Sequence, residues 1–455
     1  MANKNQSMVT DLTTGNVAKL LLRFAFPLFV SNALQAIYNL VDMIVVGQFI
    51  GGTGMSAVST GGDILHLLTF VAMGFSSAGQ VIIARDVGAG NHENVRRTIG
   101  TMFSFLLAIS VGISVICFAL RTPILNALNT PAESFDYTMD YTVTCIVGLV
   151  FIYGYNIVSA ILRGMGDSRR PFLFVAIAAI LNTVLDIVFV CFWGMEVFGA
   201  ALATVIGQGV SFLFSVVYLY RHKESFGFDF KPASFRLDGP CLRRLVSLGV
   251  PMAIQSAAVS FSKVVLMAWI NLFGVTYSAL AGIYNKINMM AGIVSNSFTT
   301  AGSSMVGQNL GAGKDERVPK IMRTVLWSGI VITVPASLAI LFCSGPIFAA
   351  FTGDKTVLAV ASILIAPIIL NFFGSATRSV AFSLINGSGN TNLNLAVALI
   401  DGVISRMGIA ALLGFACGME CLGFWYGDAL AGFVPILIGM TFFLSGRWKT
   451  ANRLN

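Results

Sequence analysis

The chain contains two copies of one pattern. Residues 78–91, AGQVIIARDVGAGN, recur 223 positions later as residues 301–314, AGSSMVGQNLGAGK. Further landmarks recur at offsets of 223 or 224: Pro27 with Pro251, Gly166 with Gly389, and Gly194-Met195-Glu196 with Gly418-Met419-Glu420. The 455 residues therefore form two homologous halves, and whatever fold the first half adopts the second is expected to repeat.

The background of this repeat is overwhelmingly apolar. Hydrophobic residues make up 56% of the chain and charged residues 11%, whereas soluble domains carry about 25% charged residues. The apolar runs are about 20 residues or longer, which matches a hydrocarbon core about 30 Å thick. The short alternating segments of a membrane β-barrel are absent. We predict an all-α integral membrane protein.

The apolar runs predict twelve transmembrane helices, arranged as two lobes of six helices each. The spans lie near residues 18–46, 54–84, 95–120, 138–162, 171–193, 197–220, 243–270, 276–308, 319–344, 357–385, 393–415 and 422–445. We assign 1–220 to an N-lobe, 221–242 to a cytoplasmic linker and 243–455 to a C-lobe. Because six is even, both lobes have the same orientation, so a pseudo-twofold axis along the membrane normal should relate them.

The charges indicate orientation rather than a nucleic-acid surface. Of the 28 Lys and Arg residues, 22 fall at the two ends of the chain and in the loops after even-numbered spans. Cytoplasmic loops carry such an excess of positive charge. We therefore expect a multi-pass protein of the plasma (inner) membrane, with both termini cytoplasmic, the lipid bilayer as its surroundings and no nucleic-acid partner. We expect it to be a monomer.

No motif predicts an enzyme or a nucleotide-driven pump. Gly311-Ala312-Gly313-Lys314 lacks the first glycine of a nucleotide-binding loop, and Asp315 replaces the magnesium-binding Ser or Thr. We interpret it, like its copy at 88–91, as a turn that ends a helix. Acidic metal-binding runs, HExxH and paired histidines are also absent from the sequence. We expect no cofactor, and transport driven by an ion gradient or another subunit.

Polar side chains in the first half predict a shared ion site. Asp42 shares a helical face with Tyr38, and Asp186 shares one with Asn182. At 1.5 Å per residue, Asp42 lies about 28 Å and Asp186 about 24 Å from the inner ends of their spans, and Thr204 lies about 10 Å below the outer surface. These groups converge in the outer half of the membrane. The alternative is that each is a separate polar contact between helices.

The second half places basic residues inside its spans instead: Lys263, Lys286, Arg378 and Arg406, with Asp401 and Asp428. One interpretation is that they form structural ion pairs with these acids. The other is that Lys263 or Arg378 lines the transport cavity and favours a substrate with an anionic group. The candidate residues for a substrate cavity are Tyr38, Gln35, Asn156, Lys263, Lys286 and Arg378.

Several segments together resemble the multidrug and toxic compound extrusion (MATE) family over essentially the whole chain. They are Pro27 with Val41-Asp42, Leu162-Arg163-Gly164-Met165-Gly166-Asp167, Leu181-Asn182-Thr183-Val184-Leu185-Asp186 and the two Gly-Ala-Gly turns. The resemblance implies an antiporter that exports amphipathic, mostly cationic drugs or metabolites in exchange for H⁺ or Na⁺. In the DinF-like branch the cation-binding, ion-coupling residues match Asp42, Asn182, Asp186 and Thr204, so no metal beyond Na⁺ is implied.

The chain departs from one branch of this family. NorM-like members carry an additional Glu and Asp in the C-lobe, and Val259 and Ser375 occupy those positions here. We therefore expect coupling in the N-lobe, where a cation or proton at Asp42 would let the first span bend at a hinge, Pro27, because proline removes a backbone hydrogen bond. The alternative function is a flippase for lipid-linked precursors from the same superfamily, which Lys263 and Arg378 keep open.

Overall fold

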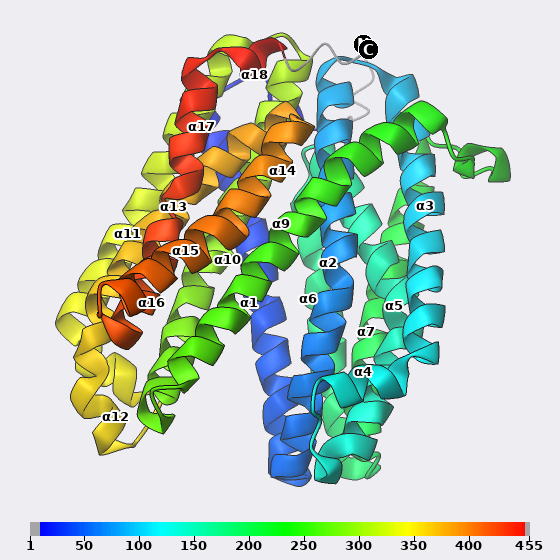
Figure 1. Ribbon diagram of the computed structural model, residues 1–455. Helices are drawn as coiled ribbons and strands as arrows, with labels where there is room; N and C mark the ends of the chain where they lie inside the picture. Colours follow the sequence, from blue (N-terminus) through cyan, green and yellow to red (C-terminus); the bar gives the residue numbers. More distant parts are fainter. Residues whose placement is uncertain (1–9, 451–455) are drawn as a thin grey trace. The chain divides into compact units, whose positions relative to one another are not determined.

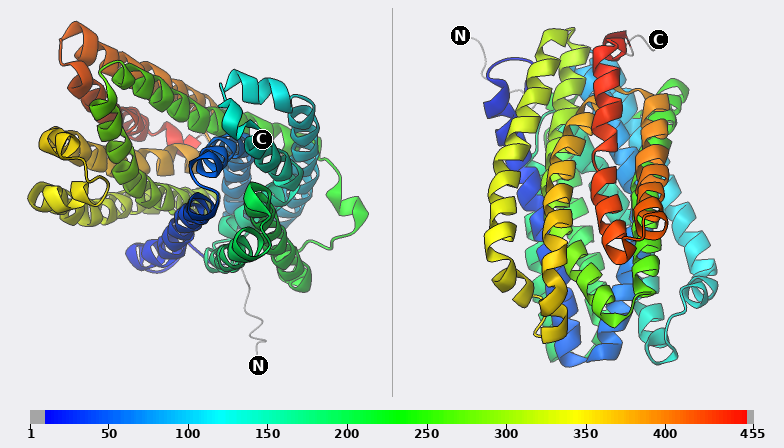
Figure 2. Two further views of the ribbon diagram at one scale, coloured as in Figure 1. Left: turned by 90° about the horizontal axis from the view of Figure 1, so that it is seen from below. Right: turned by 60° about the vertical axis from the view of Figure 1, so that its left-hand side comes forward.

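Every regular secondary-structure element within residues 10–450, the part that the computed structural model describes, is a helix (Figure 1). Residues 1–9 and 451–455, which include charged ends used in the topology prediction, lie outside the described residues. The described part divides into two compact units. The first holds residues 10–11 and Phe26–Gly249, and the second holds Leu12–Ala25 and residues 250–450. Within each unit the long helices lie side by side (Figures 1 and 2).

The first half of the chain forms six long helices, of 18 to 37 residues, and several short ones. Their bounds are α1 Val17–Phe49, α2 Gly52–Gly88, α3 His92–Ala119, α4 Arg121–Ala127, η1 Ala132–Ser134, α5 Phe135–Gly164, α6 Arg169–Asp186, η2 Ile187–Phe192, α7 Glu196–Arg221, α8 Lys223–Phe226 and η3 Pro232–Phe235. The segments η1 and η3 are 3-10 helices, whereas η2 is a π-helical continuation of α6.

The second half repeats this order with more interruptions. Its helices are α9 Gly239–Asn271, α10 Val275–Gly311, η4 Asp315–Arg317, α11 Val318–Ala349, α12 Lys355–Val360, η5 Ala361–Leu364, α13 Ile365–Ser388, α14 Thr391–Leu399, η6 Ile400–Ser405, α15 Arg406–Ala411, η7 Leu412–Ala416, α16 Glu420–Ala431, α17 Val434–Leu444 and α18 Arg447–Thr450. Both η6 and η7 are π-helical.

Eleven helical segments in residues 10–450 are long and apolar enough to cross a membrane. The twelfth expected span corresponds to α10, which is as long as its counterpart α2, at 37 residues. It falls short in hydropathy because polar residues occur along its whole length, from Asn285 and Lys286 to the Ser-, Thr- and Asn-rich stretch 295–304. The prediction of a twelve-helix, two-lobe membrane protein is confirmed, with one helix distinctly more polar than the others.

The duplication extends to the backbone of the turns. Gly90 after α2 and Gly313 after α10 adopt φ values of 69° and 70°, in the left-handed region that glycine enters without a steric penalty. In the second copy, the N–H of Lys314 donates to the carbonyl of Asn309 at 2.8 Å. These hydrogen bonds close the ends of the helices, as the sequence predicted, so the Gly-Ala-Gly segments are helix-ending turns.

One added residue distinguishes the two halves locally. The repeat offset is 223 at Gly166 and Gly389 but 224 at Gly194 and Gly418, so the second half contains one extra residue between these landmarks. The π-helical segment η7 matches η2 at that offset, whereas η6 matches a regular part of α6. Because a π turn accommodates one additional residue within a helix, η6 is where the structure absorbs the insertion.

The first long helix of each half changes unit near a proline. Helix α1 belongs to the second unit up to Ala25 and to the first from Phe26, next to Pro27. Helix α9 belongs to the first unit up to Gly249, two residues before Pro251. Each proline lacks the N–H that would continue the helical hydrogen bonds, so both positions are points where the helix can bend.

Candidate functional site

In the first unit, three helices contribute the predicted polar side chains to one buried region. Asp42 comes from α1, Asn182 and Asp186 from α6, and Thr204 from α7. The residues Asp42, Asn182 and Asp186 are only 5%, 3% and 0% exposed. Burying charged groups to this extent is expensive unless they are paired, so the partners of these side chains decide what the site can do.

Close packing of α6 against α7 brings two of the predicted residues together. At Gly207 on α7, a Cβ atom would lie only 3.1 Å from the carbonyl oxygen of Ala178 on α6. The small residue therefore permits a close approach between the helices. One turn before it, Thr204 accepts a hydrogen bond from Asn182 Nδ2 at 3.3 Å. Asn182 and Thr204, two of the residues predicted to converge, are therefore in contact.

Helix α5 adds a partner that the sequence analysis missed. The hydroxyl of Tyr141 lies 3.5 Å from Asp42 Oδ2, and the tyrosine itself is 4% exposed. On the same side of α1, Tyr38 accepts a hydrogen bond from Gln208 Nε2 at 3.4 Å. A single tyrosine in an apolar span forms no sequence pattern that would predict a role. Its contact with Asp42 follows only from the packing of α5 against α1.

The region contains more acceptors than donors. Among residues 10–450, no donor reaches four of its buried oxygens: Asp42 Oδ1, Asn182 Oδ1, Asp186 Oδ1 and Asp186 Oδ2. In addition, the charges of Asp42 and Asp186 interact with each other. Buried acceptors are normally hydrogen-bonded, and two neighbouring carboxylates repel when both are ionised. This arrangement therefore favours a bound cation or proton.

The chemistry of these oxygens suits a hard cation. Carboxylate, amide and hydroxyl oxygens are preferred by cations that bind oxygen rather than nitrogen or sulfur. Within the described residues, no group of three or more His, Cys, Asp and Glu side chains could hold a metal ion. The four predicted residues offer oxygen ligands, the type that Na⁺ accepts, and their carboxylates can also take up a proton.

In the second unit, the buried charges are paired. Arg378 Nη2 lies 2.6 Å from Asp401 Oδ2, and Arg406 Nη2 lies 3.5 Å from Asp401 Oδ1. Arg406 also pairs with Asp428 Oδ1. Of the two interpretations drawn from the sequence, the structure shows the ion pairs for Arg378 and Arg406. We call Arg378, Asp401, Arg406 and Asp428 the ionic network.

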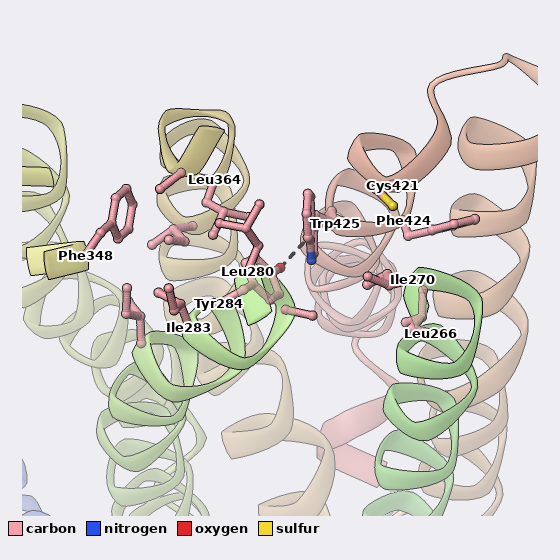
Figure 3. Packing of buried hydrophobic residues seen from close by; sticks show 14 of the residues in the cluster. Leu266, Ile270, Leu280, Ile283, Tyr284, Phe348, Leu364, Cys421, Phe424 and Trp425 are labelled. Atoms are coloured by element: carbon pink, nitrogen blue, oxygen red, sulfur yellow. Dashed lines mark hydrogen bonds between the residues drawn. The ribbon is translucent and has the colours of Figure 1, made fainter. Parts of the chain in front are cut away.

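Neutral donors complete this network. The other oxygen of Asp428, Oδ2, accepts a hydrogen bond from the Tyr284 hydroxyl at 3.0 Å and one from Asn371 Nδ2 at 3.3 Å. Both oxygens of Asp428 are therefore occupied by groups of the same unit. Tyr284, which donates to Asp428, also belongs to a buried hydrophobic cluster with Phe424 and Trp425 (Figure 3).

The predicted cavity residues are divided between the two units. Lys263 lines a cleft in the second unit together with Tyr284 and Asp428, whereas neither Arg378 nor Lys286 is among its lining residues. In the first unit, the side-chain amide of Asn156 donates to the carbonyl of Ile152 on its own helix at 2.8 Å. Gln35 is partly buried on α1.

Comparison with known proteins identifies the family. The sequence model of the MatE family matches residues 27–188 and 251–416. The chain is 27% identical over 422 residues to the probable multidrug resistance protein YoeA of Bacillus subtilis (strain 168), covering 91% of each chain. It is 26% identical over 444 residues to the probable multidrug resistance protein NorM of Thermotoga maritima, covering 95% of this chain and 93% of the relative.

Solved structures agree on the fold. A crystal structure of MATE in a bent conformation superposes with a TM-score of 0.89 over 99% of this chain and 100% of that chain, at 20% identity. A MOP superfamily transporter from Pyrococcus furiosus gives a TM-score of 0.87 over 100% of both chains, also at 20% identity. With a family match that spans both halves and curated relatives named as probable multidrug resistance proteins, the chain belongs to the MATE family of efflux transporters and is not an enzyme.

Proposed function

We propose that the chain is a secondary active antiporter that exports amphipathic, mostly cationic organic compounds in exchange for H⁺ or Na⁺. Asp42, Asn182, Asp186 and Thr204 form the ion-coupling site. The observation that carries the proposal is the set of four buried oxygens that no donor reaches within residues 10–450. A membrane protein retains unpaired buried carboxylates mainly where they serve ion or substrate transport.

The coupling works through the charge of the first unit. A cation or proton at Asp42 and Asp186 relieves the repulsion between the two carboxylates. In the same helix as Asp42, Pro27 interrupts the backbone hydrogen bonds, and its carbonyl accepts a bond from the Ser31 hydroxyl at 2.8 Å. Such a serine bond beside a proline eases bending of a helix. Ion binding at Asp42 thus biases the conformation of α1 about Pro27.

The proposed membrane location and orientation follow from the distribution of positive charges along the sequence. We propose the inner membrane as the location, with both termini in the cytoplasm, because the positive charges lie on that side. We further propose that the transporter acts as a monomer and needs no cofactor other than the exchanged ion.

Transport by purified protein in proteoliposomes tests the proposal. A proton gradient and a sodium gradient are imposed separately, and efflux of a cationic dye is followed for the parent protein and Asp42→Asn. We expect gradient-driven efflux in the parent and its loss in the variant. Asp140→Asn, which removes an exposed carboxylate from α5, serves as the matched control. Full gradient-driven efflux in Asp42→Asn would contradict the coupling site.

A lipid-linked precursor flippase is the second candidate. The observation in its favour is Lys263, a basic residue that lines a cleft within a membrane-spanning unit. The test uses a fluorescent lipid-linked precursor in the same proteoliposomes, with a membrane-impermeant quencher outside. Movement of this lipid, without dye efflux under either gradient, would favour the flippase.

A further inference from the structure

The second unit contains a cleft next to the ionic network. Helix α9 contributes Lys263 and Ile270 to its lining, α10 contributes Tyr284 and Asn285, and α16 contributes Trp425 and Asp428. Its empty volume is about 290 Å³, part of which is open space. Because part of this space is open, the cleft can enclose only a small group, such as an anionic head group, and leaves the rest of a ligand outside.

The charges around the cleft do not balance. In the ionic network, Arg378 and Arg406 neutralise Asp401 and Asp428. Lys263 adds a further positive charge, and within residues 10–450 no carboxylate oxygen lies within 4.0 Å of its amine. An unpaired ammonium group in a membrane span is costly. A bound anion would supply the missing charge.

Asp428, the neighbour of Lys263 in the lining, acts on the lysine only at longer range and forms no ion pair with it. One oxygen of Asp428 is taken by Arg406, and the other accepts hydrogen bonds from Tyr284 and Asn371. The net charge that the cleft presents is therefore that of the lysine. It attracts anions and repels cations.

A second group at the cleft also requires an acceptor. Trp425 is 1% exposed, and its indole Nε1 has no hydrogen-bond partner among the described residues. Figure 3 shows the ring next to Tyr284 on one side and to Ile270 and Leu266 on the other, all of which line the cleft. A buried indole N–H usually finds a partner. A bound anionic group would give the indole N–H the acceptor that it lacks.

Apolar side chains form the rest of the lining. Leu266, Met267 and Ile270 follow Lys263 along α9, and Phe424 faces them from α16. A lysine at one end and aliphatic and aromatic walls beyond it match a molecule with a charged head and an apolar body. We propose that this cleft binds the carboxylate or phosphate group of an amphipathic substrate, with Lys263 as its charge partner.

The inference rests on the proposed export function and specifies its substrate class. Among the amphipathic compounds that the transporter would carry, those bearing an anionic group, including zwitterions, gain a contact that purely cationic compounds lack. The same group occurs on membrane lipids and on water-soluble amphipaths, so the test has to distinguish these two sources.

Binding of a matched pair of probes to the purified full-length protein in detergent tests the charge preference. The probes are a dansyl-labelled long-chain fatty acid and its uncharged primary amide. We expect the carboxylate to bind about tenfold more tightly than the amide, equivalent to about 1.4 kcal/mol. Lys263→Gln should abolish this preference without weakening amide binding, and Lys263→Arg should retain it.

Two further variants separate charge from folding. Lys355→Gln removes a lysine of the same unit that does not line the cleft, and it should keep the full carboxylate preference. Trp425→Phe keeps an aromatic ring and removes only the indole donor, so it should weaken carboxylate binding about threefold. Equal affinity of the parent protein for acid and amide, or an undiminished preference in Lys263→Gln, would overturn the inference.

Competition identifies the source of the anion. Displacement of the fatty-acid probe by phosphatidic acid micelles would support a lipid ligand, and displacement by octanoate would support a water-soluble one. Displacement by neither would overturn the inference. Asp42→Asn separates it from the proposed function, because this variant should lose gradient-driven efflux and still prefer the carboxylate probe.

Discussion

The two units place different chemistry at equivalent positions. At the repeat offset of 224, Asn182 corresponds to Arg406 and Thr204 corresponds to Asp428. The first pair forms a neutral hydrogen bond of 3.3 Å, whereas the second forms an ion pair. The same two points of helix contact thus serve a polar pair in one half and a charged pair in the other.

The two units also differ in whether the protein itself supplies a positive charge to their buried carboxylates. In the second unit the guanidinium of Arg406 lies between Asp401 and Asp428, so the protein itself neutralises these carboxylates. In the first unit, no donor within residues 10–450 reaches Asp186, and only one oxygen of Asp42 has a partner, Tyr141. A site that contains its own cation has no need of another. A duplicated fold can therefore assign ion exchange to one half and leave the other free for a different role.

The extra π-helical turn contributes to this difference. Asp401 lies in η6, the π-helical segment without a counterpart in the first half, and Arg406 follows directly after it. A π turn changes the rotation of the residues that follow it along the helix axis. The single inserted residue therefore lies in the same π-helical segment as Asp401, an acid without a counterpart in the first half.

The largest expected effect comes from removing the internal cation. Arg406→Met leaves Asp428 and part of Asp401 buried without their charge partner, which costs about 3–5 kcal/mol when one member of a buried pair is removed. Denaturant titration in mixed micelles measures this loss. The double variant Arg406→Asn with Asp428→Thr installs the neutral pair of the first unit and should recover most of it. No recovery in the double variant would mean that the two contacts are not equivalent.

Neutralising one carboxylate in each unit should have opposite consequences. Asp428→Asn weakens the contacts with Arg406 and Tyr284, and we expect a loss of about 2 kcal/mol because hydrogen bonds to charged groups contribute about 1.5–3 kcal/mol each. Asp186→Asn removes a buried charge that has no donor in the described residues. It should leave stability unchanged or increase it. Thermal unfolding in detergent compares both, and equal destabilisation would contradict the distinction between the sites.

Ligand binding should stabilise only the site that lacks its own cation. At ten times its dissociation constant, the exchanged cation should stabilise the parent protein by about 1.4 kcal/mol, since a ligand that binds only the folded state shifts the unfolding equilibrium. Melting temperatures are recorded in a Na⁺ titration at constant ionic strength and in a parallel H⁺ titration. Asp42→Asn should abolish the response. An identical response in the variant would place the ion elsewhere.

The smallest expected effect on stability concerns the N-termini of α1 and α9, the first long helix of each half. Asp238 Oδ1 accepts from the N–H of Cys241 at 2.9 Å before α9, and Asn16 Oδ1 accepts from the N–H of Lys19 at 3.0 Å before α1. The N–H of Cys241 and the nearby arginines hold the pKa of Asp238 below its ordinary value. Its stabilising effect is therefore present above the unfolded pKa of about 3.9 and is lost as the pH falls through the folded pKa.

Alanine substitutions of Asp238 and Asn16 compare an ionisable residue with a neutral one at the start of a helix. Asp238→Ala and Asn16→Ala should each cost about 1 kcal/mol at neutral pH. The loss for Asp238→Ala should shrink as the pH falls below the unfolded pKa of about 3.9 and through the lower folded pKa, because the carboxylate is progressively protonated there, whereas that for Asn16→Ala should not change. Parallel pH profiles of unfolding for the two variants would contradict the assignment.

Much of the architecture was predictable from local features of the sequence. Long apolar runs identify membrane helices because burial in lipid depends on composition over a single segment. The duplication was visible in its glycine turns, where φ near 70° at Gly90 and Gly313 requires the same residue type in both copies. The members of the candidate ion site were also named in advance, since Asp42 and Asp186 are exceptional within apolar spans.

The sequence by itself thus determined the helical membrane class, the twofold repeat and the candidate acids, all of which follow from composition and spacing along one segment. Only the tertiary structure decided that Arg406 pairs with Asp428, that Tyr141 meets Asp42, and that Lys263 opens onto a cleft without a carboxylate partner in the described residues. Such contacts depend on the rotation and separation of helices far apart in the chain. Small residues such as Gly207 and the extra turn of η6 set these quantities through packing.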